Sequence, residues 1–243
     1  MNYFPINLNI HGRTCTVIGG GRVAARKVAA LIDYGGRVVV ISPKLTEELR
    51  QLKEQNKISW CARTYRHGDL HDSFLVIAAT DDEKVQQEVQ AEAEAAGTLL
   101  NVADVPDRCN FILPATVRHG DFAIAISTGG NSPALAKHLR REISTHYGPE
   151  YGLLCEILGC LRPFILALGR GHQENKKIFA TLLHDQFPDW IREKNYGKIE
   201  NHLWSIPGWQ PDQEVMFKIR GLLDPNLLYN FKARGNPTTS YEY

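Results

Sequence analysis

Short apolar segments alternate with longer amphipathic ones over the first hundred residues of the chain. Five of the apolar segments are typical of buried β-strands, at residues 14–18, 37–41, 58–62, 74–80 and 99–103. Stretches of helical periodicity lie between several of them, which predicts parallel strands joined by crossover helices. The predicted fold class is therefore α/β, a Rossmann-like doubly wound parallel sheet.

Two amphipathic helices are predicted between these strands. The first follows a glycine run and ends at Gly35, and the second covers residues 85–96 and ends at Gly97, since glycine commonly closes a helix. Asp81 and Asp82 precede the second helix, where acidic residues act as caps and first-turn acids. We therefore do not nominate these two aspartates for chemistry.

The pattern changes after residue 104. Residues 111–117 and 122–127 alternate as the strands of a β-hairpin around a turn at residues 118–121, and a helix over 134–146 follows Ser132-Pro133. We expect this hairpin and helix to form a small dimerisation and substrate-binding unit.

The rest of the chain is predicted to be a helical module. A long apolar repeat starts at residue 149 and contains Pro163, which predicts a kink, and shorter amphipathic helices are expected near 175–187 and 212–223. The last ten residues, 234–243, have the composition of a disordered tail.

Composition and charge exclude several classes of protein. The net charge of +1 gives no bias toward nucleic acid or an anionic membrane surface. The longest apolar runs are far too short to cross a bilayer, and the first residues lack the layout of a signal peptide. The five cysteines are scattered, without the spacing of a zinc or redox motif, so we expect reduced, buried thiols and no metal site. A cytoplasmic protein without nucleic-acid or membrane partners is expected.

Three consecutive glycines, Gly19, Gly20 and Gly21, stand between the first predicted strand and the first helix. With Ala24 they match the dinucleotide-binding pattern G-x-G-x-x-A, in which bare backbone makes the turn and approaches a pyrophosphate. The helix start then offers N–H groups and a positive dipole to the phosphates. A tight structural turn can produce the same match, but the strand before it and the helix and strand after it favour nucleotide binding.

One feature departs from this pattern. The ribose-binding acid expected about twenty residues later is missing, and the second strand ends in Ser42, Pro43 and Lys44. Ser42 can reach a ribose hydroxyl, whereas Lys44 can favour a 2′-phosphate or simply be a solvated loop residue. The choice between NAD and NADP stays open from these residues.

Four blocks of sequence carry a resemblance to a known family. In chain order they are FPINLNIHGRTCTVIGGGRVAARKVAALIDYGGRVVVISP, FLVIAATDD, NVADVPDRCNFILPA and ISTGGNSPALAKHLR. Together they cover about the first 145 residues and resemble the precorrin-2 dehydrogenase and sirohydrochlorin ferrochelatase family of siroheme biosynthesis. The set is far more specific than any single motif.

The resemblance implies a function. Members use NAD to oxidise precorrin-2 to sirohydrochlorin, and many then insert a ferrous ion, a second substrate, to give siroheme. It also implies a homodimer built through the segment after the nucleotide domain. No stretch resembles the methyltransferase module of fused members, so we expect a stand-alone form that receives precorrin-2 from another enzyme.

The resemblance also assigns site residues. It places NAD against Gly19, Gly20, Gly21, Arg22, Val23, Pro43, Lys44 and Thr80. It makes Asp104 the catalytic aspartate, at the carboxyl end of the fifth strand, although an aspartate there can also simply cap a turn.

A glycine-rich segment and a basic helix are the candidate sites for the substrate carboxylates. Free N–H groups and cations suit such anions, although an ordinary solvated basic face explains the charge equally well. The candidates are Thr128, Gly129, Gly130, Asn131, Ser132 and Lys137.

Two alternatives stay open. One is a dehydrogenase without chelatase activity, and the other is an NAD-binding regulatory module that catalyses nothing. Whichever function applies, the chain is predicted to have three parts. They are an NAD-binding Rossmann domain at 1–110, the dimerisation and substrate-binding unit at 111–147 and the helical module with its tail at 148–243.

Overall fold

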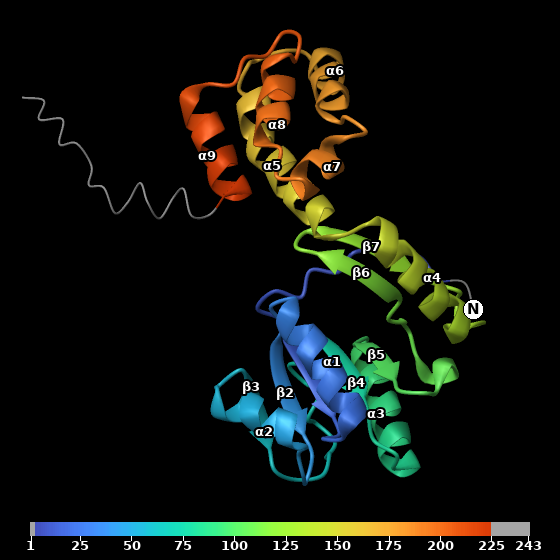
Figure 1. The fold of residues 1–243 in the computed structure, drawn as a ribbon. Helices are drawn as coiled ribbons and strands as arrows, with labels where there is room; N and C mark the ends of the chain where they lie inside the picture. The colour runs from blue at the N-terminus through green and yellow to red at the C-terminus, as the bar shows by residue number, and fades with distance from the viewer. Residues whose placement is uncertain (1–2, 225–243) are drawn as a thin grey trace, which may run out of the picture. The chain divides into compact units, whose positions relative to one another are not determined.

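The computed structural model describes residues 3–224, which divide into two units (Figure 1). The first comprises the residues up to Leu113 together with Thr128–Ser132. The second comprises Pro114–Ser127 and the described residues from Pro133 onward. The predicted disordered tail at 234–243 lies outside the described residues, and the three-part division stays a prediction.

A five-stranded parallel sheet forms the centre of the first unit, in the order β3-β2-β1-β4-β5. Its strands are β1 (Thr14–Ile18), β2 (Arg37–Ile41), β3 (Ile58–Cys61), β4 (Leu75–Ala78) and β5 (Leu99–Val102). All five predicted strands are confirmed, although the last three are shorter than expected. Phe74, Ala79 and Thr80 lie outside the β4 ladder, in the turns that flank it.

Helices cover both faces of this sheet (Figure 1). They are α1 (Arg22–Asp33), α2 (Glu47–Glu54) and α3 (Glu83–Ala96), and a 3-10 turn η1 (Pro106–Arg108) follows β5. Side chains of β4 alternate between two cores: Leu75 and Ile77 pack with α1 and α2, and Val76 and Ala78 pack with α3. The predicted doubly wound α/β fold is confirmed.

The predicted helix ends agree with the structure. Gly35 follows α1 with φ +74°, and Gly97 caps α3 with φ +63°, conformations that glycine adopts without strain. Asp82 is the N-cap of α3, and its carboxylate accepts a hydrogen bond from the Val85 N–H at 3.1 Å. Asp81 lies before the cap and Glu83 is the acid of the first turn, so only Asp82 takes one of the two roles predicted for this pair.

The chain order of the sheet creates a switch point between β1 and β4. The path runs outward from β1 to β3 and then crosses to β4 on the other side of β1. Loops that follow β1 and β4 therefore diverge at the carboxyl edge of the sheet, where open α/β sheets bind their ligands. The glycine run follows β1 and Thr80 follows β4, so the two candidate segments flank this point.

The second unit opens with a hairpin, β6 (Ala115–His119) and β7 (Phe122–Ile126), followed by α4 (Pro133–His146). The predicted strand start at residue 111 is wrong, because Phe111 packs in the sheet core of the first unit. The predicted four-residue turn is also wrong: His119 pairs with Phe122, and Gly120 at φ +59° makes a two-residue turn.

A helical bundle completes the second unit, with a core built around the long helix α5. Its helices are α5 (Pro149–Leu166), α6 (His172–Leu182), α7 (Phe187–Arg192), α8 (Tyr196–Trp204) and α9 (Gln213–Leu223). The single helix expected at 175–187 is wrong, because α6 ends at Leu182 and α7 begins at Phe187. Helix α5 continues through Pro163, and α8 was not predicted.

All five cysteines are free, as predicted, but their expected burial holds only for Cys15 and Cys109. Cys61, Cys155 and Cys160 are partly exposed. None of the helices described between residues 3 and 224 is long and apolar enough to span a membrane.

A buried carboxylate fixes the loop between β3 and β4 to helix α3. Glu92 accepts hydrogen bonds from the Tyr65 hydroxyl and from the backbone N–H groups of Gly68 and Leu70, the last two at 2.8 Å. Burial alone would raise the pKa of Glu92, but these hydrogen bonds outweigh it and hold the pKa below its ordinary value. The ionised form is thus the one that holds the loop.

Replacing Glu92 by glutamine should destabilise the first unit by about 1–3 kcal/mol. The amide supplies one acceptor where the carboxylate supplied two, so a buried N–H such as that of Leu70 loses its partner. Chemical denaturation at pH 7 measures this loss, with the exposed Glu88→Gln on the same helix as control.

The pH dependence of stability tests the same contact. Because the folded-state pKa of Glu92 is depressed, its contribution is present above its unfolded pKa and is lost as the pH falls through the folded value. Stability of the unsubstituted chain should therefore fall more steeply than that of Glu92→Gln below about pH 4.5. Parallel slopes for the two proteins in this range would contradict the assignment.

Candidate active site at the carboxyl edge of the sheet

The glycine run divides into two structural roles. A Cβ on Gly19 would lie 2.1 Å from the Ala79 carbonyl oxygen, and a Cβ on Gly20 would lie 2.0 Å from that of Lys44. Gly19 also has φ +116°, which side-chain-bearing residues rarely adopt. These two glycines are required by the packing of the loop itself.

Gly21 has a different environment. It is the N-cap of α1, its backbone is extended, and a Cβ there would meet nothing within 4 Å. The protein therefore imposes no steric need for glycine at this position. Open space directly before the helix is what the approach of a pyrophosphate to backbone requires.

The amino end of α1 also lacks a side-chain cap. Helices α5 and α6 also start at a glycine without a side-chain cap, but each has a glutamate in its first turn, whereas α1 has no acid there. Its first N–H groups and its positive dipole end are left for an external anion. The residues present thus fit a dinucleotide, with Arg22 and Val23 at the first two helical positions.

The loop after β2 closes the other side of the glycine run. The Ser42 hydroxyl is buried and donates to the Lys44 carbonyl at 2.8 Å, and the Thr46 N–H donates to the Gly20 carbonyl at 2.9 Å. Pro43 and Lys44 are exposed. Ser42 thus holds the loop shape, and its predicted contact with the ribose stays a prediction.

Thr80 lies just beyond β4, beside the glycine run. Its backbone nitrogen is 3.3 Å from the position that a Gly19 Cβ would take. Its carbonyl accepts a hydrogen bond from the amide nitrogen of Gln86 at 2.7 Å, and the Gln86 side chain in turn accepts one from Arg108 at 3.1 Å. Sequence patterns gave no signal for Gln86 or Arg108, because both act through contacts between distant segments.

Asp104 is exposed at the carboxyl end of β5, with φ +62°. A residue other than glycine in this left-handed region is uncommon, and such conformations cluster at functional sites, although aspartate tolerates them better than most residues. The turn therefore places Asp104 on the same sheet edge as Gly21 and Thr80.

Lys27 of α1 is a cation near this carboxylate that the sequence did not reveal. Burial lowers the pKa of its ammonium and Arg26 lowers it further, whereas Asp104 and Cys109 act in the opposite direction. A half-buried lysine that senses the charge of Asp104 adds a positive potential to the edge. The sequence did not single out Lys27 because this residue lies in an ordinary amphipathic helix.

The predicted substrate residues fall in both units. Thr128, Gly129, Gly130, Asn131 and Ser132 form a compact turn in the first unit, in which the Asn131 and Ser132 N–H groups donate to the Thr128 carbonyl and hydroxyl oxygens. The exposed Lys137 belongs to α4 in the second unit. Their role in substrate binding stays a prediction.

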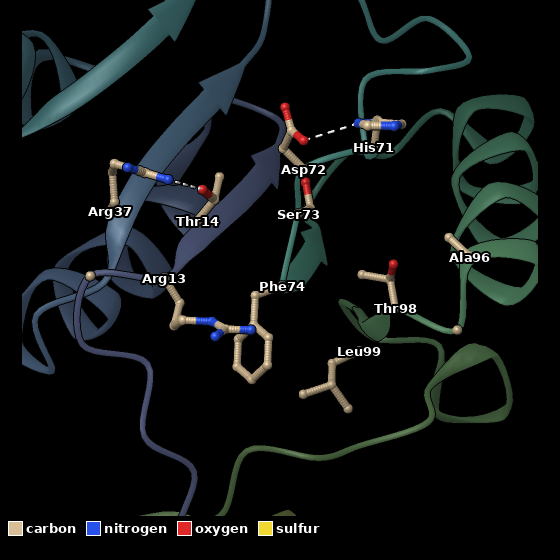
Figure 2. Close-up of a pocket in the computed structure, with 12 residues that line it drawn as sticks. Arg13, Thr14, Arg37, His71, Asp72, Ser73, Phe74, Ala96, Thr98 and Leu99 are labelled. Carbon is tan, nitrogen blue, oxygen red and sulfur yellow. Dashed lines mark hydrogen bonds and ion pairs between the residues drawn. The ribbon is translucent and has the colours of Figure 1, made fainter.

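A separate hollow of about 430 Å³ lies at the opposite, amino-terminal edge of the sheet (Figure 2). Its polar groups are largely engaged with their neighbours: Arg37 donates to the Thr14 hydroxyl at 2.7 Å, and the Arg13 guanidinium stacks 4.2 Å from the centre of the Phe74 ring. None of the predicted site residues lines this hollow. It is distinct from the glycine loop.

Comparison with known families identifies both parts of the chain. Residues 6–115 match a family model described as putative NAD(P)-binding, and residues 120–146 match the model of the sirohaem biosynthesis protein central domain. Siroheme synthases from Nitrosococcus oceani and Nitrosomonas europaea are 38% and 39% identical over 238 and 239 residues, 96% of this chain in each case. This chain is similar to siroheme synthases over nearly its whole length.

The relatives are longer than this chain, and a solved structure matches its fold. The chain spans about half the length of these relatives, 50% in both cases. A solved structure titled SirC, precorrin-2 dehydrogenase, superposes with a TM-score of 0.69 over 82% of this chain and all of that one, at 24% identity. This superposition confirms the fold of this chain.

Proposed function

We propose that this chain oxidises precorrin-2 to sirohydrochlorin with NAD as the acceptor. The observation that carries the proposal is the combination, at one sheet edge, of an uncapped helix start open in front of Gly21 and the Asp104 carboxylate in a left-handed turn. Similarity to siroheme synthases over nearly the whole chain supports the substrate class. A regulatory module would need the first feature but not the second.

Nucleotide binding and proton acceptance are assigned to different residues. NAD, when bound, supplies the hydride acceptor. Gly21 and the first N–H groups of α1 would hold the pyrophosphate, and the Thr80 segment would contact the nucleotide. Asp104 accepts the proton that leaves the macrocycle as the hydride departs. Both electrons leave with the hydride, so the step is balanced.

The proposal also includes a second reaction, the insertion of ferrous ion into sirohydrochlorin. A chelatase needs a base for the ring N–H protons and a transient ligand for the incoming ion, which is a substrate rather than a resident group. No group of three or more His, Cys, Asp or Glu suited to a metal occurs within residues 3–224. We propose that Asp104 serves this step as well, and a dehydrogenase without chelatase activity is the alternative outcome of the same assay.

A homodimer is proposed for the assembled enzyme. The hairpin of the second unit has only two strands, so β6 and β7 each have one edge without a neighbouring strand in the described chain. Ala123 and Ala125 on β7 are exposed small apolar residues. Light scattering at micromolar concentration should return twice the chain mass of 27.4 kDa, and a monomer under these conditions would rule the dimer out.

We also propose a cytoplasmic location for the protein. Five free thiols suit a reducing compartment, and NAD-linked oxidation is carried out where that cofactor is maintained. Cell fractionation should recover the protein with the soluble contents, and recovery with the envelope would contradict this location.

A further inference from the structure

Gln86 holds the segment that follows β4. It lies on the first turn of α3, its side chain is buried, and its amide nitrogen donates to the Thr80 carbonyl at 2.7 Å. The Thr80 segment in turn packs against Gly19, where no Cβ can be accommodated. Gln86 is therefore linked to the glycine run through one intermediate, the Thr80 segment.

Arg108 reaches the same glutamine from the other side. Its guanidinium donates to the side-chain amide oxygen of Gln86 at 3.1 Å and to the Glu83 carboxylate at 3.2 Å. The Arg108 side chain is 21% exposed. The two donors of the planar guanidinium thus fix its position on α3. Because the glutamine donates to Thr80 and accepts from Arg108, the orientation of its amide is fully specified.

Arg108 also belongs to the turn that carries the candidate base. It ends η1, its backbone N–H donates to the Val105 carbonyl at 3.1 Å, and Asp104 immediately precedes Val105. Arg108 therefore attaches this turn to α3. A continuous set of contacts runs from Thr80 through Gln86 and Arg108 to the backbone next to Asp104.

We propose that Gln86 and Arg108 are positioning residues that couple the nucleotide-side Thr80 segment to the turn carrying Asp104. The inference rests on the proposed function, and nothing in the sequence motifs assigns either residue. Through this coupling, nucleotide binding next to Thr80 and alignment of the Asp104 carboxylate support each other. Misplacement of a reacting group by about 1 Å costs about 10²-fold in rate, so such a device has a large effect on turnover.

A double-mutant cycle tests the coupling. The variants are Gln86→Leu, Arg108→Met and the combination, with Gln51→Leu on α2 and Arg66→Met in the loop after β3, both exposed, as matched controls. For each we measure the dissociation constant of NAD by titration, then kcat and KM for precorrin-2 oxidation, and the thermal unfolding midpoint.

The coupling predicts a specific pattern. Gln86→Leu should weaken NAD binding by about tenfold, and Arg108→Met should lower kcat by about 10²-fold with a smaller change in NAD affinity. In the double variant the combined effect on NAD affinity should fall short of the product of the two single effects by at least about threefold. The controls should match the unsubstituted chain.

Two results would overturn the proposal. One is multiplicative effects in the cycle, which mean that the two residues act independently. The other is a loss of kcat that only follows a lowered unfolding midpoint, which means a structural role alone. Failure of the proposed function is seen separately: an unsubstituted chain that binds NAD but does not oxidise precorrin-2 refutes the reaction, while the NAD affinities still decide the coupling.

Discussion

The Asp104→Asn variant should oxidise precorrin-2 about 10²- to 10⁴-fold more slowly than the unsubstituted chain, the range a positioned general base contributes. Its NAD affinity should stay unchanged, because the pyrophosphate site lies at Gly21 on the other side of β4. Stopped-flow or steady-state absorbance measures the rate, and nucleotide titration measures the affinity. Chelation of ferrous ion should fall in parallel if Asp104 also accepts the ring N–H protons.

Asparagine is the right substitution because of the backbone at this position. Asp104 has φ +62°, a conformation that asparagine tolerates but that costs alanine about 1–2 kcal/mol. Asp104→Asn therefore removes the base and leaves the turn intact, whereas Asp104→Ala would confound the two. Oxidation by Asp104→Asn at the unsubstituted rate would mean that Asp104 only shapes the turn.

Replacing Gly21 by aspartate should weaken NAD binding by about 10²- to 10³-fold and leave the fold intact. One extra carboxylate about 4 Å from a phosphate costs about 4 kcal/mol at a partly exposed site. The same carboxylate is a favourable N-cap for α1, so the unfolding free energy should stay equal or rise by a few tenths of a kcal/mol. Binding and stability therefore move in opposite directions, which a general folding defect cannot produce.

Neighbouring glycines supply the controls for this experiment. Gly21→Ala adds a Cβ into open space and should retain most of the affinity, since alanine brings no charge. Gly20→Ala should instead destabilise the first unit, because its Cβ would lie 2.0 Å from the Lys44 carbonyl oxygen. Calorimetric titration with NAD reports affinity and thermal unfolding reports stability. Unchanged NAD affinity in Gly21→Asp would remove the nucleotide assignment.

The sheet of the first unit was predictable from sequence because most of its strands are buried on both faces. Such strands appear as short, continuous apolar runs, and glycines close the helices between them. The glycine run also predicted the loop, because Gly19 and Gly20 are required by the close approach of the Ala79 and Lys44 backbone. Here local preference and tertiary packing agree.

Local patterns failed where tertiary contacts decide. Phe111 alternates like a strand residue but packs against the sheet, and the short helices α7 and α8 depend on the bundle core rather than on their own periodicity. In the site, the link from Gln86 to Arg108 joins residues 22 positions apart. A single sequence carries no signal for such a hydrogen bond.

The most direct test of the proposed function is anaerobic incubation of the purified chain with precorrin-2, followed by absorbance. With NAD added, the account predicts the spectrum of sirohydrochlorin together with one equivalent of NADH. It predicts no product when the nucleotide is omitted, and formation slowed about 10²- to 10⁴-fold when Asp104→Asn replaces the unsubstituted chain. Addition of ferrous ion then shows whether the spectrum proceeds to that of siroheme. Unchanged precorrin-2 in the presence of NAD, from a chain that binds the nucleotide, would contradict the account.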